Sequence, residues 1–378
     1  MKDLLINKKR IVLTGGGTAG HVYPALAVRE HLGREYEVHY IGGSGMEKEI
    51  VQKETGITFH QIEAVKLQRK LTAKNLLIPY KFLKSVKMAK KILREINPVA
   101  IFSKGGFVAL PVVVAGRKLN IPVVSHESDL TMGLANKIIL RYCNKMCVAF
   151  EETSHLSGKC IYTGQPIRKG ILKGNKNNLS FVASLDGKKK NILVVGGSSG
   201  AKFINEKVVE NIDSLLKKYN VIHITGKGKI ERLEKPRYIQ IEYAHNMGDF
   251  LNLADVVISR AGSGAINEFK ALNIPMFLIP LSKACSRGDQ IENAKLYCKL
   301  GYAEMLEEEE FENEKFIEKI ENLIKNDKIF IKNMEKSGNF DACEEIVEII
   351  KDIELKKYTI FILKFYLFEG TQSPQNFY

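Results

Sequence analysis

Several features that define whole classes of protein are missing from this sequence. No apolar run approaches the roughly 20 residues that a membrane-spanning helix needs. The 6 cysteines form no Cys-x-x-Cys pair, so we expect reduced thiols in a cytosolic protein rather than a disulfide framework. The charged start, up to Arg10, does not resemble the apolar core of a signal peptide. With 45% hydrophobic and 26% charged residues, the chain is neither disordered nor collagen-like, and its 378 residues suggest two globular domains.

Acidic residues are absent from one long stretch, and this makes the charge distribution uneven. The chain holds 57 basic and 43 acidic residues, a formal net charge of +14. Residues 1–165 carry +12 of that excess, and residues 166–378 carry +2. Most of it comes from residues 66–94, which hold ten basic side chains and no acid. This asymmetry predicts a polyanionic partner for the first half, either nucleic acid or an anionic membrane face.

The acid-free stretch contains apolar residues at helical spacing, with lysines along the flanks. Two interpretations fit this pattern. It is either an ordinary surface helix whose apolar stripe enters the core, or an interfacial helix that dips apolar residues among lipid headgroups while its lysines meet anionic lipid. Nucleic acid is disfavoured, because neither base-stacking aromatics nor a known reader motif is found. The apolar residues are Phe82, Leu83, Val86, Ala89 and Leu93, and the candidate membrane-binding lysines are Lys81, Lys84, Lys87 and Lys91.

Two distant segments share one pattern, a short apolar strand followed by a glycine loop and a helix. They are residues 10–20, RIVLTGGGTAG, and residues 191–201, NILVVGGSSGA. Each opens a series of apolar strands that alternate with amphipathic helices, which is typical of parallel sheets covered on both faces. We therefore predict an α/β chain of two doubly wound, Rossmann-like domains facing each other across a cleft. The expected strands are residues 38–41, 99–103, 123–125 and 146–150 in the first domain, and 221–225, 239–241, 256–259 and 276–280 in the second.

The predicted domain borders follow changes in composition. Residues 1–171 form the first domain, the polar and aperiodic stretch 172–190 is a linker, and residues 191–345 form the second domain. Residues 346–378 are expected to form a helix and an apolar tail that return to the first domain. Part of that tail, residues 358–368, is strongly apolar but too short to span a bilayer. Packing on the first domain, membrane docking and self-association all remain open for it.

Both glycine loops have the composition of anion-binding turns. Gly15, Gly17 and Gly20 match G-x-G-x-x-G, but Ile41 at the end of the next strand is followed by Gly-Gly-Ser rather than by the acid of a dinucleotide site. Neither loop continues into the Gly-Lys-Ser/Thr of a Walker motif. What remains in each loop is a set of backbone N–H groups at a helix N-terminus, which suits an anion. The hydroxyls of Ser198 and Ser199 favour the second loop as the diphosphate site.

These motifs, in this order, resemble those of the MurG family. The resemblance implies the GT-B fold, a UDP-N-acetylglucosamine donor, and transfer with inversion to the C4 hydroxyl of the MurNAc of lipid I, undecaprenyl-pyrophosphoryl-MurNAc-pentapeptide. The product would be lipid II, used in bacterial peptidoglycan synthesis. The resemblance also implies a peripheral enzyme on the cytoplasmic face of the cell membrane, with no cofactor. The matching segments are residues 15–27, 103–115, 126–137, 163–168, 196–201, 259–268 and 280–294.

The resemblance also implies roles for single residues. In the first domain, Thr18, Ala19 and Gly20 face the donor sugar and the acceptor diphosphate. At the donor site, Arg168 is the family's arginine, Glu268 binds the ribose hydroxyls and Gln290 binds the sugar hydroxyls. A carboxylate that accepts from two hydroxyls makes charge-assisted bonds, and an amide both donates and accepts, so these residue types suit their ligands. The remaining implied donor contacts are Ser198, Ala244, Ser263, Gly264, Ala265, Ile266 and Asn267.

Glycosyl transfer to a hydroxyl needs a base for the acceptor proton and stabilisation of the leaving diphosphate. No Asp-x-Asp occurs in the chain, so we expect no metal clamp on the diphosphate. A helix dipole, loop N–H groups and Arg168 would then take that charge. His21 has a side chain that titrates near neutrality and is one candidate base, and Glu127 and Asp129 are the others. The sequence does not rank these three.

Two other functions are compatible with parts of this pattern. A UDP-N-acetylglucosamine 2-epimerase would keep the fold and the donor but would not need the basic apolar stretch. A basic nucleic-acid-binding protein would explain the charge but not the glycine loops, and it predicts tight, salt-sensitive binding to DNA or RNA.

Overall fold

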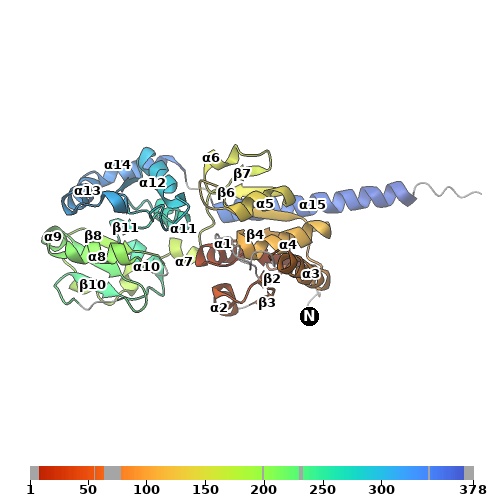
Figure 1. Cartoon of the computed structure of the whole chain (residues 1–378), viewed down its shortest axis with the longest axis horizontal. Helices are drawn as coiled ribbons and strands as arrows, with labels where there is room; N and C mark the ends of the chain where they lie inside the picture. The colour runs from red at the N-terminus through yellow and green to blue at the C-terminus, as the bar shows by residue number, and fades with distance from the viewer. Residues whose placement is uncertain are drawn as a thin grey trace, which may run out of the picture. The chain divides into compact units, whose positions relative to one another are not determined.

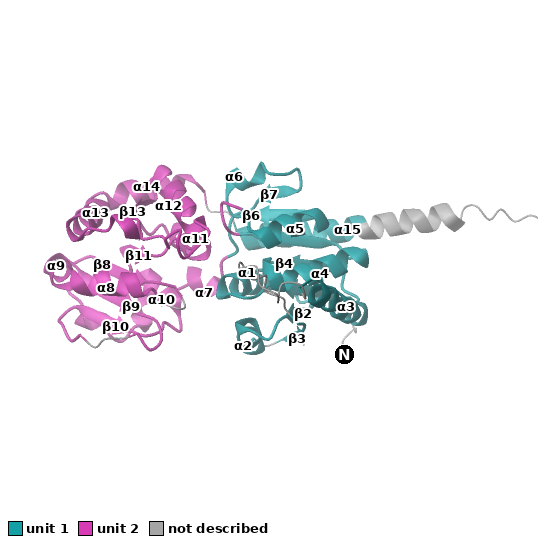
Figure 2. Cartoon of the chain, viewed as in Figure 1, with its two compact units in different colours: residues 1–127, 132–166, 341–378 teal, residues 128–131, 167–340 magenta. Residues whose placement is uncertain are grey.

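The computed structural model describes residues 8–54, 56–63, 78–197, 200–229, 233–338 and 341–369, with side chains described up to residue 356. The chain divides into two compact units (Figure 2). Unit 1 comprises residues 1–127, 132–166 and 341–378, and unit 2 comprises residues 128–131 and 167–340.

Unit 1 is built on a parallel sheet, because its strands are short, apolar and joined by helices. Among the described residues the sheet has 7 strands in the order β3-β2-β1-β4-β5-β6-β7 (Figure 1). Along β1, Val12 packs into one core cluster while its neighbours Ile11 and Leu13 pack into another, so both faces of the sheet are buried. The strands are β1 (Lys9–Thr14), β2 (Tyr36–Gly42), β3 (Ile57–Gln61), β4 (Ala100–Ser103), β5 (Val123–Glu127), β6 (Lys145–Val148) and β7 (Cys160–Tyr162).

Helices cover both faces of this sheet. On one face, α3, α4 and α5 contribute Val86, Val113 and Ile139 to the core, and on the other, α1 and α15 contribute Leu26 and Ile350. No helix of the described residues is both long and apolar enough to cross a bilayer. The helices are α1 (Ala19–Arg29), α2 (Met46–Gln52), α3 (Ile78–Ile96), α4 (Gly106–Lys118), α5 (Leu134–Tyr142), α6 (Glu151–Ser154) and α15 (Ala342–Glu369).

Unit 2 repeats this architecture with a parallel sheet in the order β10-β9-β8-β11-β12-β13. Its strands are β8 (Asn191–Val195), β9 (Asn220–Ile224), β10 (Tyr238–Ile241), β11 (Val256–Ser259), β12 (Met276–Leu278) and β13 (Ala303–Met305). Its helices are α7 (Lys169–Leu172), α8 (Lys202–Glu210), α9 (Ile212–Lys218), α10 (Met247–Leu253), α11 (Ser263–Ala271), α12 (Asp289–Lys299), α13 (Asn313–Lys325) and α14 (Asp327–Lys336). The predicted fold class, two doubly wound α/β domains, is confirmed.

The unit borders differ from the predicted domain borders. The chain passes into unit 2 after Pro166 and returns to unit 1 at Asp341, whereas the sequence analysis placed these changes after residues 171 and 345. The stretch 172–190, expected as a linker, packs on unit 2. The backbone N–H of Asn175 donates to Asp249 Oδ1 at 2.7 Å, and the Asn178 amide donates to Asp249 Oδ2 at 3.2 Å. The stretch lacks periodicity because its regular parts are single 3₁₀ turns, at residues 176–178 and 182–184.

Helix α15 ties the C-terminal region to unit 1. Glu354 is buried on this helix, where its carboxylate pairs with Lys9 Nζ at 2.6 Å and accepts from the Tyr36 hydroxyl at 2.8 Å. Burial and the Glu354 carboxylate raise the pKa of Tyr36 well above its usual value. The helix continues to Glu369, and the side chains of the apolar tail 358–368 lie outside the described residues.

Candidate functional site

The strand order places the glycine loops at the edges where such folds bind ligands. In unit 1 the direction of winding reverses between β1 and β4, and in unit 2 between β8 and β11 (Figure 1). Ligands of open α/β sheets bind outside the carboxyl ends of the strands at this reversal. Residues 15–18 after β1 and 104–105 after β4 follow neighbouring strands there in unit 1, as do residues 196–197 after β8 and 260–262 after β11 in unit 2.

The first glycine loop is bound by a carboxylate from α2 of the same unit. Glu47, which is only 1% exposed, accepts from the backbone N–H of Gly17 at 3.2 Å and of Gly43 at 3.0 Å. A Cβ on Gly16 would lie 2.8 Å from Glu47 Oε1, so this position requires glycine. The Gly17 N–H of this loop is therefore already bound within unit 1. Glu47 was not among the residues expected at the loop, although it follows the second strand closely in the sequence.

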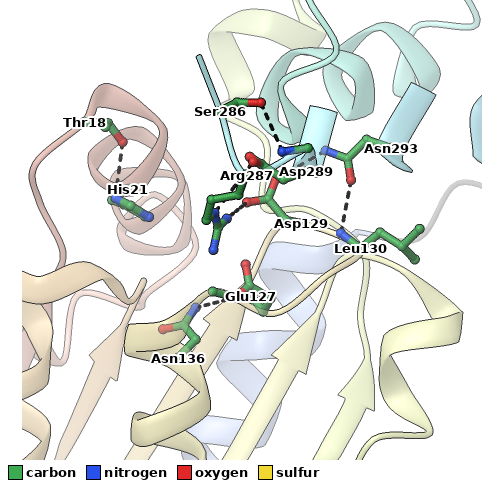
Figure 3. A network of polar contacts seen from close by, with 12 residues as sticks. Thr18, His21, Glu127, Asp129, Leu130, Asn136, Ser286, Arg287, Asp289 and Asn293 are labelled. Carbon is green, nitrogen blue, oxygen red and sulfur yellow. Dashed lines mark hydrogen bonds and ion pairs between the residues drawn. The ribbon is translucent and has the colours of Figure 1, made fainter. Parts of the chain in front are cut away.

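His21 is held in one tautomer by the same loop. Its Nδ1 lies 2.9 Å from the Gly16 carbonyl oxygen and 3.2 Å from Thr18 Oγ1 (Figure 3). A carbonyl oxygen only accepts, so Nδ1 carries the proton, and Nε2 of the neutral ring carries a lone pair. The ring lies against Gly106 at the start of α4, where an added Cβ would meet His21 Cε1 at 3.3 Å. In the neutral ring the acceptor nitrogen of His21 is thus Nε2.

The two rival bases are engaged in holding structure. Glu127 is buried, and its Oε2 accepts from the Gly133 N–H at 2.9 Å and from the Asn136 amide at 3.0 Å. Asp129 is grouped with unit 2, where its oxygens face Arg287 Nη2 at 3.4 Å and Asn293 Nδ2 at 3.3 Å (Figure 3).

In unit 2, a carboxyl group and a guanidinium come close at the N-terminal part of α11. Burial raises the pKa of Glu268 to about 7, and the positive charge of Arg168 partly offsets this rise. Arg168 caps the start of α7, so both side chains are placed by short helices of one unit. Glu268 therefore sits close to the balance between its neutral and charged forms near neutral pH, which is common for carboxylates of functional sites.

The other residues expected at the donor site fall into two groups. Gln290, near the start of α12, accepts the Leu281 N–H at 3.0 Å through Oε1, which leaves its amide nitrogen as the donor end. The side chains of Ile266 and Asn267 point into the unit interior, where Asn267 bonds the Ser263 carbonyl at 2.8 Å. Those two residues can act on a ligand only through backbone position. Ala244 is buried, Gly264 and Ala265 are partly exposed at the start of α11, and Ser198 lies outside the described residues.

Helix α3 carries the residues proposed for membrane binding, and its apolar stripe enters the core as the first interpretation expected. Val86, Ala89 and Leu93 pack into the core of unit 1, and Phe82 packs partly against it. The exposed face bears the four candidate lysines, with Lys84 paired to Glu63 at 2.8 Å, and also two large apolar side chains, Tyr80 at 70% and Leu83 at 62% exposure. Residues 66–77 of the basic stretch lie outside the described residues.

The sequence matches two family models that together span most of the chain. Residues 11–148 match the glycosyltransferase family 28 N-terminal domain, and residues 191–353 match the glycosyltransferase family 28 C-terminal domain. A Clostridium tetani protein is 45% identical over 360 residues, which cover 93% of this chain and 99% of the relative. A protein of Clostridium botulinum strain Hall is 46% identical over 358 residues, with the same coverage. Both are named UDP-N-acetylglucosamine--N-acetylmuramyl-(pentapeptide) pyrophosphoryl-undecaprenol N-acetylglucosamine transferase.

Solved structures agree with this assignment. The crystal structure of Acinetobacter baumannii MurG superposes with a TM-score of 0.71 at 25% identity, over 91% of this chain and 99% of that chain. A glycosyltransferase of kitacinnamycin also reaches a TM-score of 0.71, at 15% identity over 93% of this chain and 99% of that chain, and shows the shared fold. The N-terminal and C-terminal family models both match, and the matches cover nearly the whole length of the relatives. The chain therefore belongs to the MurG family of glycosyltransferases, within glycosyltransferase family 28.

Proposed function

We propose that this chain transfers N-acetylglucosamine from UDP-N-acetylglucosamine to the C4 hydroxyl of the MurNAc of lipid I, with inversion, to give lipid II. The observation that carries the proposal is the 45% identity to a transferase of that name over 93% of the chain, which includes both units. The epimerase and nucleic-acid alternatives have no comparable support. The reaction serves peptidoglycan synthesis, and through it cell shape and division.

The donor binds to unit 2 in this proposal. Glu268 accepts from the ribose hydroxyls, Gln290 contacts the sugar hydroxyls, and the backbone around Ala244 meets the uracil. The diphosphate lies against loop 196–201 and the start of α11, where N–H groups and the helix dipole favour negative charge. Arg168 supplies a full positive charge beside this site, as its effect on the Glu268 pKa indicates. These groups stabilise the leaving UDP as charge develops on it.

The acceptor binds to unit 1, with His21 as the base. The lone pair on Nε2 accepts the proton of the MurNAc C4 hydroxyl while the oxygen attacks the anomeric carbon of the donor. The Gly16 carbonyl bound to Nδ1–H at 2.9 Å stabilises the imidazolium that forms. Attack from the face opposite to the leaving UDP inverts the anomeric centre. Glu127 and Asp129 hold the neighbouring loop in position rather than take the proton.

The chain acts at the cytoplasmic face of the membrane in this proposal. The lipid acceptor is embedded there, and the exposed face of α3 combines Tyr80 and Leu83 with Lys81, Lys84, Lys87 and Lys91. Apolar side chains that dip among headgroups, flanked by lysines, suit an anionic lipid surface.

Paired reactions test the proposed function. The purified chain is incubated with labelled UDP-N-acetylglucosamine, with and without a lipid I analogue. We expect label in a disaccharide lipid only when the acceptor is present. Conversion of the sugar nucleotide without acceptor, or no labelled lipid with it, would contradict the proposal, and conversion to an epimer would indicate the epimerase.

A further inference from the structure

Three side chains with metal-binding atoms meet in unit 1. His31 lies just after the C-terminal end of α1, and Asp341 and Cys343 lie at the start of α15. Their ligating atoms, a ring nitrogen, a carboxylate oxygen and a sulfur, all lie within 4.8 Å of one another. The 11 residues of α1 rise about 15 Å, so this cluster and His21 occupy opposite ends of one helix.

The orientation of His31 points to a cation. Its Nδ1 lies 3.0 Å from the Ala27 carbonyl oxygen, so Nδ1 carries a proton and Nε2 of the neutral ring carries a lone pair. That Nε2 lies 3.5 Å from Asp341 Oδ2, which also bears lone pairs. Two such atoms face each other favourably only with a proton or a metal ion between them. A ring N–H bound to a backbone carbonyl is also the usual support of a metal-binding histidine.

The other two ligands are held by the first turn of α15. Asp341 Oδ1 accepts from the backbone N–H of Cys343 at 3.0 Å and of Glu344 at 3.2 Å, which fixes the carboxylate and turns Oδ2 toward His31. Cys343 is buried. A thiolate and a carboxylate carry two negative charges, which a divalent cation neutralises, and the helix N-terminus favours that negative ligand pair.

We propose that His31, Asp341 and Cys343 bind a Zn²⁺ ion that fastens α15 to α1. Nitrogen, sulfur and oxygen ligands together suit zinc. Two ligands at about 2.1 Å from a tetrahedral zinc lie about 3.4 Å apart, close to the separation of the His31 and Asp341 atoms. The Cys343 thiol gives its proton to solvent when the zinc–sulfur bond forms, and water takes the fourth position. With three protein ligands the site is not the closed type, and its part here is to hold the two helices together, away from His21.

The competing explanation is a metal-free ion pair between protonated His31 and the capping carboxylate of Asp341. Metal titration of the full-length chain distinguishes the two. The purified protein is stripped with a chelator and then titrated with Zn²⁺ or Co²⁺. We expect one tightly bound ion per chain, a rise in Tm of about 5 °C with excess Zn²⁺, and a thiolate-to-cobalt charge-transfer band with Co²⁺.

Three variants assign the ion to this cluster. Cys343→Ser removes the sulfur, and Asp341→Asn removes the charged ligand but keeps the helix cap, because asparagine caps equally well. Cys285→Ser, at an exposed thiol of unit 2, is the matched control. The proposal requires loss of the cobalt band and of the Tm rise in the first two variants and their retention in the control. Two results would overturn the proposal: wild-type protein that does not bind one zinc ion per chain, or a cobalt charge-transfer band that only Cys285→Ser abolishes. If Cys343→Ser does not fold, Asp341→Asn decides.

Discussion

At the scale of single residues, the account depends on how a few side chains are held. The sequence marked His21, Glu127 and Asp129 as equal candidates for the base, because residue type alone does not show hydrogen-bond partners. The structure shows those partners: Glu127 and Asp129 accept from amide groups of the protein, and His21 Nδ1 lies against the Gly16 carbonyl. Our proposal that His21 is the base rests on this difference.

The substitution His21→Ala tests this assignment. It removes the proton acceptor but leaves the donor site in unit 2 intact, so turnover should fall by roughly 100- to 10,000-fold with little change in UDP affinity. Steady-state kinetics with a soluble acceptor, together with calorimetric titration of UDP, provide both numbers. A fall of less than tenfold would make His21 a structural histidine and return Asp129 to consideration.

The substitution Glu268→Ala tests the proposed contact with the donor ribose. Loss of a charged hydrogen-bond partner for the ribose should weaken UDP binding by about 1.5–3 kcal/mol. The measurement is direct titration of the folded variant with UDP. Affinity equal to that of the wild type would remove Glu268 from the site.

Glu268 also predicts a pH dependence of stability. Its pKa of about 7 in the folded chain lies above the usual value of 4.5, so the folded state favours the protonated form. The stability that this group contributes is therefore present at acidic pH and is lost as the pH rises through about 7. Glu268→Gln should raise the free energy of unfolding by about 1–2 kcal/mol at pH 8 and by much less at pH 5. Thermal melts at both pH values test this, and an equal effect at both would show that burial does not raise this pKa.

At the scale of secondary structure elements, the sequence predicted the central strands and the edge strand β10, but not the edge strands β3, β7 and β13. Strands β1, β4 and β8 are continuous apolar runs, so their burial on both faces was readable. Strand β3, ITFHQ, and strand β13, AEM, lie at sheet edges and carry polar residues, so neither shows such a run. The glycine loops were predicted because glycine is needed there, but Glu47, which binds the first loop, lies on α2, and the sequence alone does not show that contact.

The prediction at this scale concerns membrane binding by helix α3. Replacement of Lys81, Lys84, Lys87 and Lys91 by Gln should release the protein from anionic vesicles, because each lysine near such a surface contributes on the order of 1 kcal/mol. Activity on a short-chain, water-soluble acceptor should remain. Vesicle sedimentation at low salt is the measurement.

The matched control removes the same charge from unit 2. The four lysines chosen, Lys217, Lys299, Lys325 and Lys328, are all exposed. Their replacement by Gln should leave sedimentation unchanged. If the α3 variant and the control sediment alike, α3 is not the docking surface, and the apolar tail 358–368 becomes the next candidate.

At the scale of the whole molecule, the proposed function gives each unit its own chemical task, and the charge differs between the two halves of the chain. The first 165 residues carry +12 and the remainder +2. That contrast was visible in the sequence, as was the repeated strand–glycine–helix pattern that predicted two similar domains. The chain returns to unit 1 at Asp341, whereas the sequence predicted this return at residue 346. The composition does not change at the junction, and the packing of α15 on α1 determines its position.

The central claim is inverting transfer to the lipid-linked sugar, and the anomeric configuration of the product tests it most directly. The wild-type chain is supplied with UDP-N-acetylglucosamine, an α-linked donor, and a lipid I analogue, and the isolated disaccharide is examined by NMR. The account predicts a β-(1→4) bond between N-acetylglucosamine and MurNAc, because the hydroxyl attacks from the face opposite to UDP. An α bond, a bond to a different hydroxyl, or no disaccharide at all would contradict it.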